Sequence, residues 1–193
     1  MPDGSSDRGA RKDLRAASSS PWSVRLATTD DLPDLVRIEN EAIARGGETG
    51  FLEPHSLDDR RRWFESRDLA QFPTLAATRE GTTAGFLWLS PYRPGRLALR
   101  HSAEVTLFIA QPHQGTGAGR ALLEEALARA PAAGITRILA FILAKNDVSG
   151  RFFSRMGFER WGTFPGVAMI DGAPVDHHIY GLSLDTDSFP RSP

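Results

Sequence analysis

Apolar residues recur along the chain with two different periods. Runs in which every second residue is apolar predict strands, and the continuous apolar run at residues 137–143 predicts a strand that is buried on both faces. Stretches in which apolar residues return every three or four positions predict amphipathic helices. Strands are expected at residues 22–27, 74–78, 84–89, 102–110, 137–143, 161–170 and 175–184, and helices after Thr29, after Ser56, after Gly117 and at 148–156. This order predicts a mixed α/β sheet with helices packed on its faces.

Turn and capping residues set the limits of these elements. Thr29 is expected to cap the first helix, with acidic residues in the first turn, where the helix dipole favours them. Ser56 is expected to cap the second helix, with Asp59 three residues later in a weaker form of the capping box. The segments 80–82 and 171–172 carry the Gly-containing turns that join hairpin strands.

Length and composition indicate one domain without extreme character. The chain has 193 residues and a formal net charge of -1, which gives no sign of a basic nucleic-acid surface. Residues 22–185 are expected to form a single domain. The polar N-terminal tail at 1–21 is expected to be disordered, and a short polar tail is expected at 186–193. The absence of cysteine, of a long apolar run and of a signal-like N-terminus favours a cytoplasmic protein without a membrane partner. Arginine far outnumbers lysine, which is typical of a GC-rich bacterial source.

A glycine-rich loop at residues 114–120 follows an apolar strand and opens a helix. Such a loop offers free backbone N–H groups and the positive end of a helix dipole, so it predicts an anion site, most often for phosphate. The Walker pattern is excluded because Arg120 and Ala121 follow the last glycine, and the dinucleotide fingerprint is excluded by glycine spacing. A plain glycine-rich turn is the alternative that the loop alone leaves open.

The surroundings of this loop resemble the GNAT family of N-acetyltransferases. The loop pattern Gln114-x-x-Gly117-x-Gly119 is similar to the family's acetyl-CoA loop, and a short helix followed by Gly157-Phe158 is similar to a later family motif. The resemblance extends over residues 23–184. It is greatest to the phosphinothricin (or methionine sulfoximine) acetyltransferase group, through Glu104, Arg96-x-Ala98, and the segments 48–51, 146–147 and 162–163.

The resemblance implies a fold, a co-substrate and a set of site residues. The fold would be a central, mostly antiparallel sheet of six or seven strands flanked by about four helices. Acetyl-CoA would be the co-substrate, no metal would be needed, and a homodimer would be expected. The implied cofactor-binding residues are Leu107, Phe108, Ile109, Gln114, Gly115, Thr116, Gly117, Ala118, Gly119, Arg120, Asn146 and Phe153, and the implied substrate-binding residues are Phe51, Tyr92 and Arg96.

Glu104 is the candidate catalytic residue. It stands in an otherwise apolar strand, where burial would raise the pKa of a carboxylate. A general base is required because an ammonium group must lose a proton before its nitrogen can attack a thioester. The alternative from position alone is a structural carboxylate paired with an arginine. A backbone N–H near Ile109 is the expected donor to the thioester oxygen.

Several positions differ from the resembled pattern. Phe153 occupies the place where many family members have a tyrosine that protonates the departing thiolate. Leu99 and Val175 replace an aromatic residue and a histidine that the phosphinothricin group commonly has. His177 and His178 are adjacent in a strand, so they should point to opposite faces.

These departures leave the identity of the amine open. The hypothesis is an N-acetyltransferase for the primary amine of a small amino-acid-like substrate, whose carboxylate Arg93 or Arg96 would bind. The alternatives are an acetyltransferase for protein or peptide amines and an acyl-CoA-binding module without catalysis.

Overall fold

The computed structural model describes residues 20–184. All but Ser20 and Pro21 of the predicted N-terminal tail, and the whole predicted C-terminal tail, lie outside this range. The α-helices are α1 (Leu32–Arg45), α2 (Leu57–Glu65), α3 (Ala118–Arg129) and α4 (Asp147–Arg155). The strands are β1 (Ser23–Leu26), β2 (Thr74–Arg79), β3 (Thr82–Pro91), β4 (Ser102–Ile109), β5 (Arg137–Leu143), β6 (Glu159–Ile170) and β7 (Ala173–Ser183).

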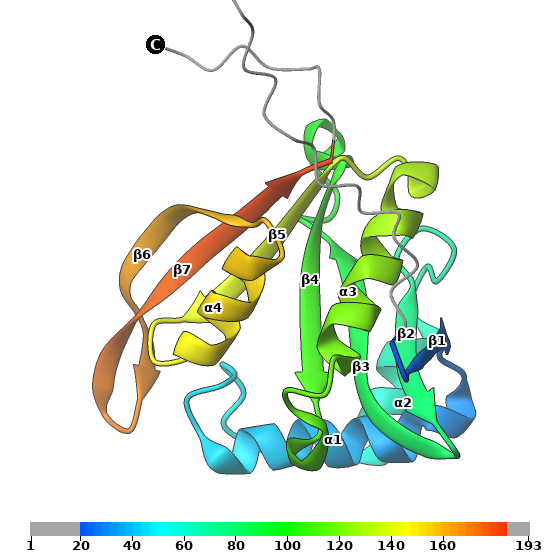
Figure 1. Cartoon of the computed structure of the whole chain (residues 1–193). Coiled ribbons are helices and arrows are strands. Elements are labelled where there is room, and N and C mark those ends of the chain that lie inside the picture. The colour runs from blue at the N-terminus through cyan, green and yellow to red at the C-terminus, as the bar shows by residue number, and fades with distance from the viewer. Residues whose placement is uncertain (1–19, 185–193) are drawn as a thin grey trace, which may run out of the picture.

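The seven strands form one sheet in the order β1-β2-β3-β4-β5-β7-β6 (Figure 1). Every neighbouring pair is antiparallel except β4 and β5, which are parallel. The predicted mixed α/β fold with a mostly antiparallel sheet and four helices is therefore confirmed. No helix among residues 20–184 combines the length and the apolar character that crossing a bilayer requires.

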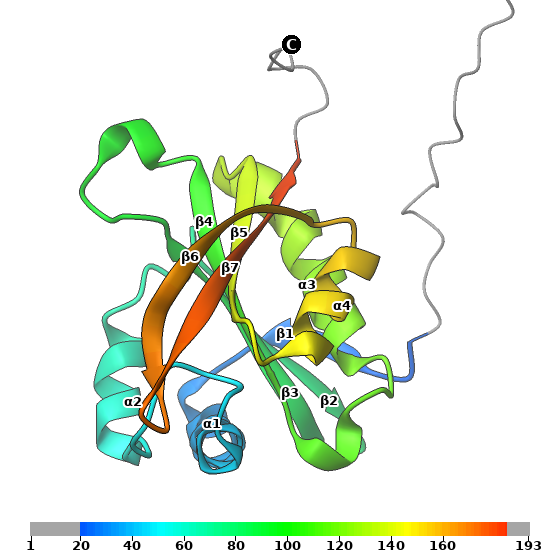
Figure 2. The ribbon, with the colours of Figure 1, turned by 90° about the vertical axis from the view of Figure 1, so that its left-hand side faces the viewer.

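The helices cover both faces of the sheet, as the two perpendicular views show (Figures 1 and 2). Helix α3 packs on one face, where its Leu122 and Ile138 of β5 belong to one apolar core, and Phe153 of α4 joins the same core. Helices α1 and α2 pack on the other face, where Leu35 and Phe64 contact Phe86 and its neighbours. The sheet therefore separates two apolar cores, one beneath α3 and α4 and one beneath α1 and α2.

The helix starts follow local capping chemistry, with one correction. Thr28, not the predicted Thr29, is the capping residue, because residues Thr29–Asp31 form a 3₁₀ turn before α1 begins. The Thr28 N–H donates to the Asp31 carboxylate over 2.8 Å, which satisfies a donor left free at the start of the turn. Ser56 caps α2 as predicted, and its Oγ accepts the N–H of Asp59 at 3.1 Å.

The two predicted hairpin turns are present. Glu80 and Gly81 have φ angles of 51° and 77°, and Asp171 and Gly172 have φ angles of 53° and 75°. Positive φ at both central residues is the backbone of a type I′ turn, whose twist matches that of the flanking strands. These turns join β2 to β3 and β6 to β7.

Candidate active site

The parallel strands β4 and β5 pair over only part of their length. The register joins Ser102–Glu104 to Arg137–Leu139, yet β4 continues to Ile109 and β5 to Leu143. The Ala110 N–H donates to Ala84 of β3 over 2.8 Å, so by strand alternation the N–H groups of Leu107 and Ile109 point away from β3, toward β5. These backbone groups have no ladder partner in β5 and are free for a ligand.

The glycine-rich loop lies at the end of β4 and has the conformation of an anion site. Gly115 and Gly117 have φ angles of 76° and 92°, which disfavour a side chain. Within residues 20–184, no protein acceptor receives the backbone N–H groups of Gly115, Gly117, Ala118, Gly119 and Arg120. Five free donors at a helix N-terminus can hold the oxygens of a phosphate group.

Trp22 fastens this loop and was not identified from the sequence. Its indole N–H lies 3.1 Å from Thr116 Oγ1 and 3.3 Å from the Thr116 carbonyl oxygen. Its ring meets the His113 ring edge-on, with centroids 5.1 Å apart. The contact joins positions 94 apart in the chain, so no local pattern could have indicated it.

Helix α4 faces the loop through Phe152 rather than Phe153. A Cβ added to Gly119 would lie 3.5 to 3.6 Å from Leu107, Ile109 and Phe152, so Gly119 sits between β4 and α4. Phe153 is 5% exposed and packs edge-on against Phe158 with ring centroids 5.0 Å apart. Its position supports the alternative of core packing over a direct cofactor contact.

Asn146 links α4 to the loop between α1 and α2. Its Oδ1 accepts the Ser149 N–H at 3.1 Å and so caps α4, while its Nδ2 donates to the Glu48 carbonyl over 3.2 Å. Gln114 Nε2 lies 3.4 Å from the Ile109 carbonyl oxygen, beside the unpaired part of β4. Asn146 and Gln114, both predicted to bind the cofactor, thus lie near the ends of β5 and β4, the two strands that separate.

Phe108 was also predicted to bind the cofactor, but its side chain lies elsewhere. Its ring is 8% exposed and stacks on Trp88 with centroids 5.7 Å apart, in the core beneath α1 and α2. Its backbone is in register with Phe86 of β3. Neither part of Phe108 faces β5, so its neighbours Leu107 and Ile109 carry the expected backbone contacts.

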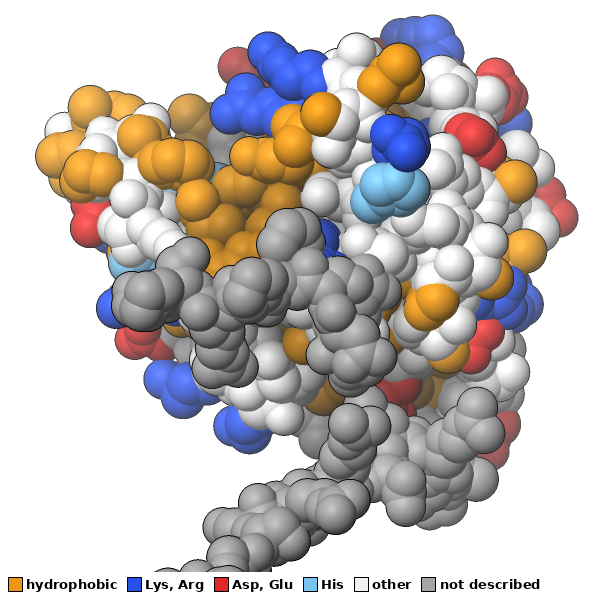
Figure 3. All heavy atoms as spheres, turned by 90° about the horizontal axis from the view of Figure 1, so that it is seen from above, with side chains coloured by type: hydrophobic (Ala, Val, Ile, Leu, Met, Phe, Trp, Pro, Cys, Tyr) orange, Lys and Arg blue, Asp and Glu red, His pale blue; other side chains and the backbone are white. Residues whose placement is uncertain are grey.

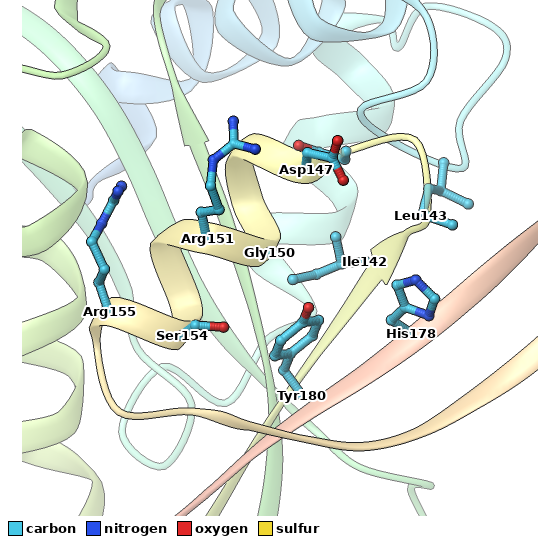
Figure 4. A pocket seen from close by; sticks show the side chains of 11 residues that line it. Ile142, Leu143, Asp147, Gly150, Arg151, Ser154, Arg155, His178 and Tyr180 are labelled. Atoms are coloured by element: carbon cyan, nitrogen blue, oxygen red, sulfur yellow. The ribbon is translucent and has the colours of Figure 1, made fainter.

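A pocket of about 370 Å³ lies between α4 and the strands β5 and β7 (Figure 4). Tyr180 and His178 of β7 line it with Ile142 of β5, and Tyr180 points toward Gly150 of α4 while Arg151 extends away. Ile142 and His178 are register partners on the α3–α4 face of the sheet. The pocket is therefore on the opposite face from Glu104, beside Asn146.

Glu104 lies where β4 and β5 begin to separate. Its register partners are Ser90 of β3 and Leu139 of β5, and it points to the face covered by α1 and α2. Burial raises the pKa of the Glu104 carboxyl above its ordinary value. Among the described residues, its side chain makes no hydrogen bond or ion pair, so the alternative of a structural carboxylate paired with an arginine is not observed.

Aromatic residues lie beside Glu104 on this face. Tyr92 stacks on Phe141 with ring centroids 6.2 Å apart, and Phe141 meets His177 at 5.6 Å. His178 points to the other face, toward Thr163 Oγ1 at 3.0 Å, which confirms the prediction that the two histidines diverge. Arg93 lies 5.8 Å from the Tyr92 ring.

The remaining predicted substrate residues lie on loops. Arg96 precedes the short 3₁₀ helix Leu97–Leu99 and is exposed. Phe51 is 45% exposed, and its ring packs edge-on against His55 with centroids 4.5 Å apart. No contact brings Phe51 or Arg96 to Glu104, so their roles stay predictions.

A buried ion pair supports the Phe51 loop, and the sequence did not indicate it. Arg60 Nη2 of α2 lies 2.5 Å from the Glu39 carboxylate of α1. The Arg60 guanidinium lies 5.5 Å from the Phe51 ring and 5.0 Å from the Trp63 ring. Both side chains are buried, so the ion pair joins α1 to α2 in the interior of the protein.

Comparison with known proteins decides the family. Residues 35–158 match the model of the "Acetyltransferase (GNAT) family". The chain belongs to the GNAT acetyltransferase family. This GNAT acetyltransferase is 36% identical over 162 residues to the Bacillus subtilis (strain 168) protein YwnH, provisionally named a phosphinothricin acetyltransferase, covering 84% of this chain and 99% of the relative.

Further relatives agree with the resemblance read from the motifs. A Pseudomonas paraeruginosa L-methionine sulfoximine/L-methionine sulfone acetyltransferase is 30% identical over 84% of this chain and 95% of its own length. The crystal structure of a phosphinothricin acetyltransferase from Sinorhizobium meliloti in complex with AcCoA has a TM-score of 0.81 and 25% identity, covering 89% of this chain and 94% of that one. The prediction of an acetyltransferase similar to the phosphinothricin group is confirmed.

Proposed function

We propose that this GNAT acetyltransferase moves an acetyl group from acetyl-CoA to the primary amine of a small amino-acid-like substrate. The observation that carries the proposal is Glu104, a half-buried carboxylate without an ion partner among the described residues, at the point where β4 and β5 separate. The names of the relatives support the class of acceptor, and the AcCoA in the Sinorhizobium meliloti structure supports the donor.

The unpaired backbone of the chain fits acetyl-CoA. The free N–H groups at Gly115 and residues 117–120 suit the pyrophosphate, and the outward backbone groups of Leu107 and Ile109 suit the amides of the pantetheine arm. Asn146, one of the residues implied to bind the cofactor, follows the end of β5 and would lie near that arm. When bound, acetyl-CoA supplies the acetyl thioester whose carbonyl carbon the amine attacks.

Glu104 would take the proton that the ammonium group must lose, because its raised pKa makes it a better base than an ordinary carboxylate. The Ile109 N–H would donate to the carbonyl oxygen as negative charge develops there. As the new C–N bond forms, the C–S bond breaks and the electron pair leaves with sulfur, and the second proton of the amine nitrogen passes to the thiolate or to water. Phe153 has no proton to give, and a thiolate is stable enough near neutral pH to leave without one.

Release of free CoA from acetyl-CoA tests the proposal. The panel contains L-amino acids, phosphinothricin, methionine sulfoximine, polyamines and short peptides. We expect turnover with amino-acid-like amines. Turnover with peptides alone would favour a protein or peptide acetyltransferase, and tight CoA binding without turnover on any amine would favour an acyl-CoA-binding module.

A homodimer and a cytoplasmic location belong to the same proposal. Strand β6 ends the sheet, and its Val167 and Met169 side chains are 61% and 60% exposed, which would suit contact with a second copy. Light scattering after size exclusion gives the mass directly, and a monomer at micromolar concentration would refute the dimer.

A further inference from the structure

One row of residues leads from Glu104 across three strands. Glu104 of β4 is in register with Leu139 of β5, and Leu139 is in register with Gly181 of β7. Directly opposite residues in neighbouring strands lie on the same face of a sheet. This row therefore runs from the candidate base along the face that α1 and α2 only partly cover.

Trp161 of β6 lies over the far end of this row. A register shift between Arg160 and Gly162 takes Trp161 out of the ladder. A Cβ added to Gly181 would lie 2.2 Å from two atoms of the Trp161 ring, so the ring rests directly on that glycine. Strands are about 4.8 Å apart, which places the ring roughly 10 Å from Glu104 along the sheet.

The same face carries further aromatic side chains. Phe141 is two residues beyond Leu139 on β5, and Tyr92 stacks on it at 6.2 Å. Phe164 of β6 is in register with His177, and the Trp161 and Phe164 side chains are 47% and 41% exposed. Figure 3 shows hydrophobic side chains gathered on the side of the molecule where β6 and β7 lie, with Lys and Arg side chains at their border. We call Tyr92, Phe141, Trp161 and Phe164 the aromatic floor.

The surface of the floor is mostly apolar, and Glu159, the register partner of Gly181 on β6, adds a carboxylate at its exposed end. The residues of β7 on this face are Val175, His177, Ile179 and Gly181. Burial lowers the pKa of the His177 imidazole and so favours its neutral form, although a hydrogen bond with the Phe141 backbone opposes this shift. A short side chain that ends in a charged or strongly polar group would gain little from such a surface.

We propose, on the basis of the proposed function, that the aromatic floor is the side-chain subsite of the acceptor. The amine would lie at Glu104, and an aromatic or large aliphatic side chain would extend over Leu139 toward Trp161. Aromatic rings add packing geometry to the burial of apolar area, so an aromatic amino acid is the acceptor that fits best.

The test compares kcat/KM for acetylation of L-phenylalanine, L-alanine and L-methionine sulfoximine, measured by CoA release with the full chain. The kcat/KM for L-phenylalanine is expected to be higher than the values for both other substrates. It should exceed the value for L-alanine by on the order of 100-fold, because alanine lacks the carbon atoms that would fill an apolar pocket. Trp161→Ala should lower the phenylalanine-to-alanine ratio by about 10-fold. Gly181→Ala should lower it too, because the new Cβ displaces the ring. Val148→Ala, an exposed change on α4, is the control and should leave the ratio unchanged.

The outcomes separate this proposal from the one on which it rests. Faster turnover of methionine sulfoximine than of phenylalanine, or a Trp161→Ala ratio equal to that of the parent chain, would overturn the subsite while leaving the acetyltransferase reaction intact. If the parent chain acetylates no amine at all, the proposed function fails, and the subsite fails with it.

Discussion

The buried ion pair of Glu39 and Arg60 allows a direct test of how burial of a carboxylate changes the stability of the protein with pH. Burial raises the pKa of the Glu39 carboxyl to about 7 from an ordinary value of 4.5, and the Arg60 charge opposes this rise only in part. The perturbation is Glu39→Gln, which keeps an oxygen for the Arg60 guanidinium and removes the ionisation. Glu41→Gln, an exposed change on the same helix, is the control.

The magnitude follows from linkage between protonation and folding. The two pKa values differ by about 2.5, and each pH unit is worth about 1.4 kcal/mol, so the free energy involved is about 3 kcal/mol. Because the pKa is higher in the folded state, the stabilisation is complete below pH 4.5 and is lost as pH rises through about 7. The parent chain should therefore lose stability relative to Glu39→Gln between these limits.

Urea unfolding at half-unit pH steps measures this difference. The free energy of unfolding of the parent chain minus that of Glu39→Gln should fall by about 3 kcal/mol from pH 4.5 to pH 8. This fall should exceed any change in the same difference for Glu41→Gln, whose carboxylate lies on the outer side of α1. Parallel curves for the parent chain and Glu39→Gln would show that the buried carboxylate titrates alike in both states, and the reasoning would be wrong.

Three further predictions concern the loop, the sheet and a helix cap. Trp22→Phe removes the indole donor to Thr116, so the Kd for acetyl-CoA measured by calorimetry should rise about 5-fold, the equivalent of one hydrogen bond. An unchanged Kd would show that the contact between Trp22 and the loop does not contribute to cofactor binding. Gly85→Ala should cost about 2–3 kcal/mol in urea unfolding because its Cβ would lie 2.3 Å from the Phe108 carbonyl oxygen, whereas Gly50→Ala, which meets no atom within 4 Å, should cost under about 0.5 kcal/mol. Equal losses would contradict the close approach. Ser56→Ala should lower the unfolding free energy by about 1 kcal/mol through loss of the α2 cap, and a loss within error would mean that the cap is dispensable.

Features set by neighbouring residues could be predicted from the sequence. Glu80-Gly81 and Asp171-Gly172 adopt the turns that their residue types favour, because positive φ is a local steric property. The cap at Ser56 and the glycine loop before α3 follow for the same reason. The buried strand at residues 137–143 was also clear, since a continuous apolar run needs cover on both faces.

Features that depend on contacts between distant segments could not be predicted from the sequence. The indole of Trp22 reaches Thr116 only because β1 is placed beside the loop by the whole sheet. The pairing of Glu39 with Arg60 joins two helices, and the seat of Trp161 on Gly181 depends on a register shift in β6. The predicted cap, Thr29, lies one residue after the observed cap, Thr28, because a 3₁₀ turn precedes α1. The residue types alone do not distinguish the start of a 3₁₀ turn from the start of an α-helix.

The pH dependence of acetyl transfer tests the role of Glu104 most directly. The acidic limb of the kcat/KM profile for the amine should have an apparent pKa above the ordinary glutamate value, because burial raises the pKa of Glu104. Glu104→Gln should abolish that limb and lower kcat/KM by about 10²- to 10⁴-fold, while the Kd for acetyl-CoA stays within about 2-fold. A Glu104→Gln enzyme with the same acidic limb and the same kcat/KM would contradict the assignment of the base.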